Sequence, residues 1–152
     1  MNLRHNTVRT VLALSFATTV PLVAAAGIAG AAPNISIVRT DAPSIDQLNA
    51  KLNLAIDTSA PRSARAAELE SGDAGVQTLD QVADVIAKAP PTMHWGLTEA
   101  HRSGDRIEGN LLLTTPGYPD FNYPVSWVRV GDSWKLSQES VCTIGAAAGA
   151  PC

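Results

Sequence analysis

The chain has 152 residues, of which 45% are hydrophobic and 16% are charged, and its formal net charge is −3. This composition supports a packed core and argues against a wholly disordered chain. The acidic balance argues against nucleic acid or an anionic membrane as the main partner, and two cysteines are too few for a disulfide-based scaffold.

Residues 1–31 have the three-part pattern of a secretory signal peptide: a basic start, an apolar run over Val11–Val23, and small residues. Cleavage after Ala31 leaves 121 residues. Because Arg4 and Arg9 leave with the signal and no acid does, the charge falls from −3 to −5. We expect a protein secreted to the medium or the cell envelope, with no stable membrane span. The alternative, an uncleaved anchor, is disfavoured by the threonines and proline inside the apolar run.

Residues 32–43 contain two prolines around a short apolar stretch and predict an extended N-terminal arm. A helix is expected after Ser44, because Ser44 and Gln47 form a capping-box pair. Apolar residues then recur at helical spacing as far as Ile56, which predicts an amphipathic helix.

Two more helices are predicted before the apolar period changes. The range Pro61–Glu70 starts with a proline, which suits the first turn of a helix. Thr78 and Gln81 repeat the capping-box pattern and predict a third helix that ends near Lys88, ahead of two prolines.

From Thr92 onward the apolar period is two, which is typical of half-buried strands. Four strands are predicted, over residues 92–101, 106–115, 125–130 and 133–139. A proline opens a long loop over 116–124, and Gly131-Asp132 fits a two-residue hairpin turn. We expect an α+β domain over residues 44–141, with N-terminal helices packed on a curved four-stranded antiparallel sheet.

Cys142 and Cys152 enclose a segment rich in Gly and Ala. In an oxidising compartment these thiols should pair, so we expect residues 142–152 to form a disulfide-closed C-terminal tail. The alternative, a redox pair, would need a close Cys-x-x-Cys-like spacing and a setting that stabilises a thiolate. The cysteines and three histidines make no familiar zinc pattern, and we expect no metal and no cofactor.

The loop over 116–124 carries Tyr118, Phe121 and Tyr123, half of the six aromatic residues that follow the signal. Its prolines lower the ordering cost of binding, and aromatic loops on a rigid scaffold are plausible contact sites. Together with Trp95, these residues are our candidates for contacting a ligand or partner. The alternative is that the rings fold back and cover the apolar face of the sheet.

Motifs for catalysis are absent from the mature sequence, which has no Gly-x-Ser-x-Gly elbow and no Gly-rich phosphate loop. His94 and His101 are seven residues apart. On one continuous strand they would point to opposite faces, which argues against a shared metal site.

The stretch from Pro43 to Gly145 resembles the low-molecular-weight secreted antigen family of mycobacteria and related actinobacteria (Mtb-twelve-like). The Ala-rich signal before a Pro-containing arm, the helix sequence Ser44–Leu52, and the strand starting at Pro124-Val125-Ser126 and leading to Trp134-Lys135-Leu136-Ser137 carry the resemblance. It implies a cystatin-like, nuclear-transport-factor-like cone. The family's C-terminal helix is not evident in this sequence, where the cysteine tail departs from the founding member.

The resemblance carries over no catalytic residue. Because the sequence has a complete fold pattern but no convergent set of polar residues, we expect a secreted non-enzymatic protein that binds a small apolar ligand or a protein partner between the sheet and the helices. The alternative is an isomerase or dehydratase of the cone fold that uses His94 or one of the carboxylates Glu99 and Glu108. It requires one of these side chains to point inward into an apolar pocket, beside a second polar group.

Overall fold

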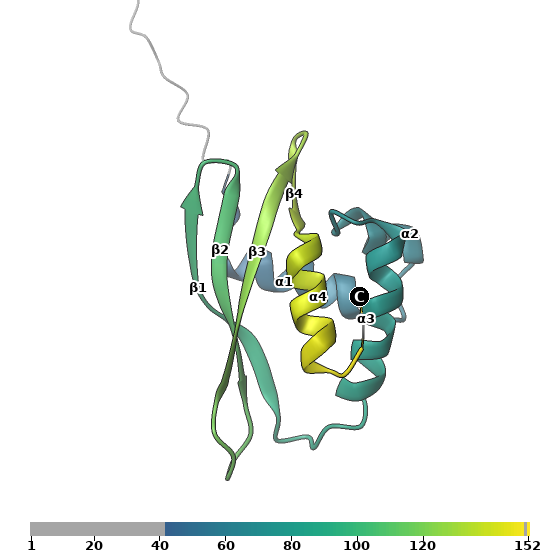
Figure 1. Ribbon diagram of the computed structural model, residues 1–152, viewed down its shortest axis with the longest axis vertical. Coiled ribbons are helices and arrows are strands. Elements are labelled where there is room, and N and C mark those ends of the chain that lie inside the picture. Colours follow the sequence, from purple (N-terminus) through teal and green to yellow (C-terminus); the bar gives the residue numbers. More distant parts are fainter. Residues whose placement is uncertain (1–41, 151) are drawn as a thin grey trace, which may run out of the picture. The chain divides into compact units, whose positions relative to one another are not determined.

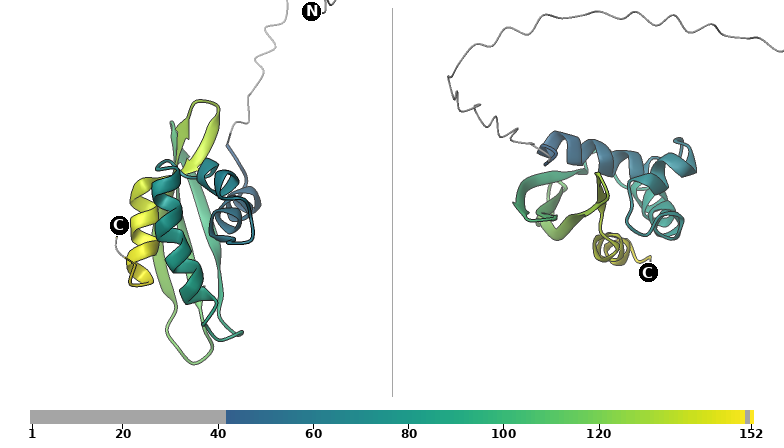
Figure 2. Two further views of the ribbon diagram at one scale, coloured as in Figure 1. Left: turned by 90° about the vertical axis from the view of Figure 1, so that its right-hand side faces the viewer. Right: turned by 90° about the horizontal axis from the view of Figure 1, so that it is seen from above.

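The computed structural model describes residues 42–150 and 152. The predicted signal peptide, and all but the last two residues of the predicted arm, lie outside the described residues. Within the described part, three helices precede a four-stranded antiparallel sheet and a further helix follows it (Figure 1). Viewed from above, the sheet curls and the helices lie along one side of it (Figure 2). The predicted α+β class, with N-terminal helices on a curved sheet, is confirmed.

The helices are α1 (Ile45–Ile56), α2 (Arg62–Ala67), α3 (Asp73–Ile86) and α4 (Gln138–Ala147). The strands are β1 (His94–Ser103), β2 (Arg106–Thr114), β3 (Phe121–Val130) and β4 (Ser133–Leu136), and they pair in the order β1-β2-β3-β4. The largest fully buried side chains come from both halves of the chain: Trp127, Leu48, Leu52, Leu69, Leu79, Ile107, Leu136, Val76 and Val141.

Helix α1 forms as its sequence predicts. The Ser44 hydroxyl accepts the backbone N–H of Gln47 at 3.3 Å, and the Gln47 side chain accepts the N–H of Ser44 at 2.9 Å. This capping box satisfies two amides that the first helical turn leaves without partners. The apolar stripe of the helix then buries Leu48 and Leu52 in the core.

Helix α2 is shorter than the predicted Pro61–Glu70 helix. After Ala67 the chain turns and runs beside β4, where the Glu70 N–H donates to the Leu136 carbonyl at 2.9 Å and the Leu136 N–H donates to the Glu68 carbonyl at 2.8 Å. These sheet-like bonds use backbone groups that a longer helix would need for itself.

Helix α3 begins at Asp73, five residues before the predicted start at Thr78. Its N-cap is Gly72, whose φ of +57° suits a glycine. Thr78 is a buried residue in the middle of the helix. The second capping-box prediction is therefore wrong, since a Thr and a Gln three residues apart also occur inside helices.

Strand β3 begins at Phe121, so the predicted loop over 116–124 is too long. Pro124 lies within the strand opposite Asn110 of β2. Strand β4 pairs only with Trp127–Val130, so at Pro124 the strand has a neighbour on one side alone. A proline is tolerated in such an edge position because no ladder partner needs its missing N–H.

Strand β1 contains a bulge between Leu97 and Glu99. Trp95 pairs with Leu113 before the bulge, and Arg102 pairs with Ile107 after it, so the inward-facing positions change from odd to even numbers. His94 and His101 consequently pair with Thr114 and Glu108, which lie on one face of β2, and both histidines are exposed. The prediction that they point to opposite faces is wrong, because it assumed a strand without a bulge.

The fourth strand ends at Leu136 rather than at residue 139, because Ser137 begins α4. Its hydroxyl accepts the Ser140 N–H at 3.1 Å as an N-cap. This helix is not among the elements predicted from the sequence, and the expected domain boundary between residues 141 and 142 falls inside it. Val141 and Ile144 are buried in the core, so the domain continues through α4.

Candidate functional site

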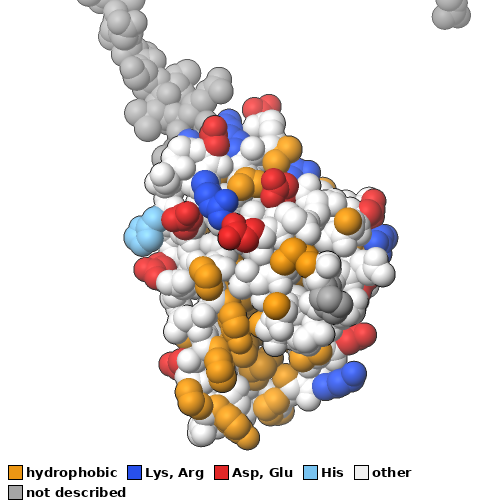
Figure 3. All heavy atoms as spheres, viewed as in Figure 1, with side chains coloured by type: hydrophobic (Ala, Val, Ile, Leu, Met, Phe, Trp, Pro, Cys, Tyr) orange, Lys and Arg blue, Asp and Glu red, His pale blue; other side chains and the backbone are white. Residues whose placement is uncertain are grey.

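An apolar pocket of about 110 Å³ lies between α3, α4 and the sheet. Figure 3 shows hydrophobic side chains gathered in a hollow on this face of the molecule. The residues that line the pocket are Ile56, Val82, Val85, Ile86, Ala89, Met93, Trp95, Leu111, Leu113, Tyr123, Ile144, Ala147 and Ala148. The volume is below that of the roughly 150 Å³ cavity that holds benzene in an engineered lysozyme, and far below the roughly 300 Å³ of a pocket that encloses a whole drug-sized ligand. The pocket therefore suits one apolar part of a molecule.

The sheet wall of the pocket is set by strand register. Trp95 lies opposite Leu113 and Tyr123 lies opposite Leu111, so four large side chains project from one face of neighbouring strands. Trp95 and Tyr123 are half-buried and pack against the core. The structure thus brings two of the four predicted contact residues together on one wall.

The other two predicted contact residues lie away from the lining. Tyr118 is 71% exposed in the β2–β3 connection, and Phe121 is 49% exposed at the first residue of β3. Phe121 pairs with Leu113, which places it next to a lining residue at the edge of the pocket. Tyr118 contributes to neither the pocket wall nor the buried core.

Helices α3 and α4 form the opposite walls. Val85 lines the pocket and is 47% exposed, although an apolar side chain of this size is usually buried. Ile144 and Ala147 of α4 line the pocket, together with Ala148, the C-cap residue of this helix. Sequence reasoning missed this wall because it predicted no helix there. The Ser137–Ser140 capping pair is the signal that would have revealed it.

A second, polar cleft of about 420 Å³ lies over the outer face of the sheet beside α4. Arg106 pairs there with Glu139 at 2.8 Å and with Glu108 at 3.4 Å. Glu99 accepts a hydrogen bond from Asn110 and lies 3.5 Å from His101. These groups are partly or fully exposed, and exposed ion pairs contribute little to stability because water and salt screen them.

The residues named for the enzyme alternative do not meet its requirement. His94, Glu99 and Glu108 are all exposed, and none of them lines the apolar pocket. The alternative needed one of these side chains inside such a pocket, so the structure contradicts it in this form.

Three buried serines join β3 to α4. The Ser137 hydroxyl lies 2.9 Å from the Ser126 hydroxyl and 2.8 Å from the Ser140 hydroxyl. The Ser126 N–H donates to the Ser140 hydroxyl at 2.7 Å. Within the described residues these hydroxyls bond to one another and to backbone, and no histidine or carboxylate takes part. These hydrogen bonds have a structural role, because they hold the start of α4 against β3.

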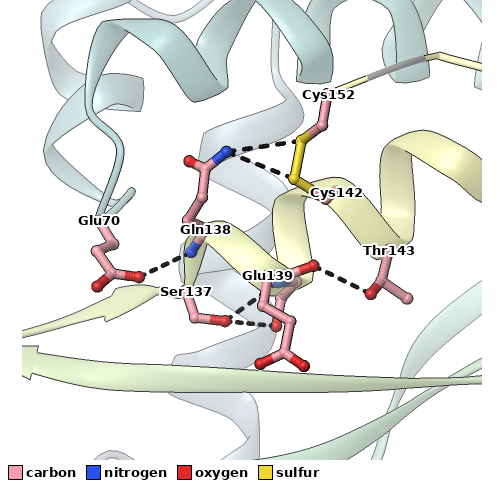
Figure 4. Close-up of a disulfide and its surroundings, with 8 residues drawn as sticks. Glu70, Ser137, Gln138, Glu139, Cys142, Thr143 and Cys152 are labelled. Carbon is pink, nitrogen blue, oxygen red and sulfur yellow. Dashed lines mark hydrogen bonds between the residues drawn. A yellow bond between two sulfur atoms is a disulfide. The ribbon is translucent and has the colours of Figure 1, made fainter.

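The predicted Cys142–Cys152 disulfide is present, with the two Cα atoms 5.1 Å apart. Figure 4 shows the Gln138 side chain pointing at both sulfur atoms, with its amide nitrogen 3.4 Å from Cys142 Sγ and 3.6 Å from Cys152 Sγ. On the other side of Gln138, its backbone N–H donates to the Glu70 carboxylate at 2.8 Å. A carboxylate at the first turn of α4 complements the positive end of the helix.

Residues 41–152 match the family model of the C-terminal domain of the low molecular weight antigen MTB12. The match covers well over half of the chain. The chain belongs to the MTB12 antigen family. A comparison with curated proteins found no match. The resemblance predicted from the α1 and β4 sequences is confirmed. An MTB12-family domain that carries a disulfide fits an oxidising extracellular compartment.

Among the described residues, no group of three or more histidine, cysteine or acidic side chains is arranged to hold a metal ion. None of the helices in residues 42–150 is long and apolar enough to cross a membrane.

Proposed function

We propose that this MTB12-family protein is an exported, non-enzymatic carrier that holds an apolar group of a small molecule in the pocket between α3, α4 and the sheet. The observation that carries the proposal is the pocket lining: thirteen residues with hydrocarbon, thioether or aromatic side chains surround a space of about 110 Å³. The signal-peptide pattern and the disulfide support export. The helices on one side of a curled sheet support the cystatin-like cone as the fold family.

The lining dictates what the bound group is. Among the lining side chains, the phenol of Tyr123 carries the one oxygen and there is no charged group. A polar group buried without a partner costs several kcal/mol, so a charged or amide part of the ligand stays in water. The enclosed part is therefore an alkyl or aryl end. Trp95 and Tyr123 contact it directly, and Phe121 lies at the rim.

A chain-length series tests the proposal. n-Alkanols from butanol to decanol are titrated into the mature protein, and binding is followed by the NMR signal of the Trp95 indole N–H. Each buried methylene contributes about 0.8 kcal/mol, so affinity should rise about fourfold per carbon and then level off when the pocket is full. Constant affinity across the series would contradict an enclosed apolar site.

A matched pair of variants locates the site. Leu113→Gln places an amide on the pocket wall, whereas Val130→Gln makes a similar change at a strand residue that is 44% exposed and outside the lining. The first variant should lose alkanol binding and the second should retain it. Equal alkanol affinity of the two variants would show that the pocket is not the binding site. Native mass spectrometry of the protein from its host's culture medium should then report a retained ligand and signal cleavage.

A further inference from the structure

The disulfide closes a compact ring that folds back onto α4. After Ala147 the chain turns at Gly149, whose φ is +73°, and the Ala150 N–H donates to the Gly145 carbonyl at 2.8 Å. Ala150 is 3% exposed, so the returning segment packs against the domain. Cys152 then reaches Cys142 in the middle of the helix.

This ring carries one wall of the apolar pocket. Ile144 and Ala147 of α4 and the C-cap residue Ala148 line the pocket, and all three lie between Cys142 and Cys152 in the sequence. The other lining residues belong to α1, α3, the connection that follows α3 and the sheet. Only the α4 wall of the pocket is therefore formed by the segment that the disulfide links at both ends, residues 142–152.

Besides the disulfide, the end of this wall is held by the packing of Ala150 and by hydrogen bonds within its own turn. The hydrogen bonds of the turn at Ala148, Gly149 and Ala150 all run to carbonyls inside the same segment, at Ile144, Gly145 and Ala146. Four of the six residues over 145–150 are alanines and the other two are glycines, which bury little area each. A covalent bond across the ring limits the conformations available to such a segment more than its side chains do.

We propose that the Cys142–Cys152 bond is a clamp on the ligand site, so that apolar ligand binding depends on the oxidation state of this one disulfide. The inference rests on the proposed function, because it concerns regulation of the same pocket. It differs from a purely stabilising role for the disulfide, because it requires the sheet and helices α1 to α3 to keep their fold when the ring opens.

The bond is placed for exchange with a dithiol. Cys152 is exposed and Cys142 is half-buried. A thiolate of the reductant attacks Cys152 Sγ, the bond between the two cysteine sulfurs breaks, and Cys142 leaves as a thiolate that takes up a proton. The second thiol of the reductant, as a thiolate, displaces Cys152, which leaves as a thiolate and is protonated in turn. Two electrons and two protons pass to the protein, and the dithiol becomes a disulfide.

The experiment compares octanol binding by the oxidised protein, the dithiothreitol-reduced protein and the C142S/C152S double variant. We expect the dissociation constant to rise at least about fivefold in both open forms, the lower end of typical coupling between sites. Reoxidation should restore the original affinity. Gln138→Ala is the matched control, because Gln138 contacts the sulfurs from outside the ring, and it should bind octanol like the wild type.

A second measurement uses thermodynamic reciprocity. In a buffer of reduced and oxidised dithiothreitol, saturating octanol should shift the equilibrium toward the disulfide by the same factor by which oxidation improves affinity. Equal affinity of both forms would overturn the clamp and leave the proposed function standing. Absence of octanol binding by the oxidised protein would overturn both. Loss of the folded Trp127 indole signal on reduction would also overturn the clamp, because the disulfide would then hold the whole fold.

Discussion

A side chain at Gly145 would collide with Thr78. A Cβ atom at residue 145 would lie 2.6 Å from the Thr78 methyl carbon and 2.9 Å from the carbonyl oxygen of Ala150. Helices α3 and α4 thus approach closely at one point, and the returning C-terminal segment packs into the same space. The absence of a side chain at Gly145 allows both contacts.

Gly145→Ala should destabilise the domain by roughly 1–3 kcal/mol, because overpacking forces neighbouring atoms apart. Thr78→Ser removes the nearer obstacle, so the double variant should recover part of the loss, which urea unfolding will measure. Ala146→Ser, one residue away on the exposed side of α4, should change stability by less than about 0.5 kcal/mol. If G145A is as stable as the wild type, the close helix contact is wrong.

Gly109 has an equivalent role in the sheet. A Cβ atom there would lie 2.5 Å from the backbone oxygen of Glu99, the residue that completes the β1 bulge. Gly109→Ala should therefore cost roughly 1–3 kcal/mol. Gly96→Ala is a matched control, since a Cβ there would meet only the Asn49 side chain at an ordinary 3.6 Å. Equal thermal midpoints for the two variants would show that the bulge does not need the glycine.

Ser140→Ala should weaken the joint between β3 and α4. It leaves the buried Ser126 N–H without its 2.7 Å acceptor, and an unsatisfied buried donor costs about 1–3 kcal/mol. The same change at Ser133, an exposed residue at the start of β4, should be close to neutral. Amide hydrogen exchange at Ser126 is the direct readout, and unchanged protection in S140A would contradict the role of this hydroxyl.

Removing the disulfide by the C142A/C152A change should lower the free energy of unfolding by roughly 3 kcal/mol or less, the value expected for closing so short a loop. The α+β fold should persist, because the described core is built from α1, α3, α4 and the sheet. Circular dichroism and urea unfolding of the double variant test both statements. A chain without cooperative unfolding would show that the ring contributes more than loop closure.

Tyr118→Ser should change neither stability nor alkanol affinity by a measurable amount, because the ring is 71% exposed and lies outside the pocket lining. Tyr123→Ser should reduce both, since Tyr123 packs against the core and lines the pocket. The pair separates two aromatic residues that the sequence places in one segment. Equal effects of the two changes would contradict the assignment of Tyr123 to the site.

The parts of the fold that follow from the sequence are those in which a local pattern has one physical meaning. The Ser44–Gln47 capping box ahead of a regular apolar stripe led to α1 within one residue, and the change of period at Thr92 located the sheet. The predicted contact residues Trp95 and Tyr123 are aromatic, and strand register places both on the pocket wall.

The errors arose where distant residues decide the local structure. The bulge at Leu97 and Glu99 depends on a strand partner without a side chain at Gly109, ten residues further along the chain. The predicted fourth strand extends past Ser137 to residue 139, where α4 begins instead, and Glu70, which accepts the Gln138 N–H, lies 68 residues earlier in the chain. A sequence pattern that spans about ten neighbouring residues contains no information about contact partners that lie far away in the chain.

Helix α4 has a consequence for the order in which this domain is made. It follows all the other described elements in the chain, yet Val141 and Ile144 occupy the core between α3 and β3. A nascent chain that has reached only Leu136 exposes the apolar sides of both neighbours. The domain therefore completes its fold only after α4 has been synthesised, and a premature stop codon between β4 and Ile144 yields a product that chaperones and proteases recognise as unfinished.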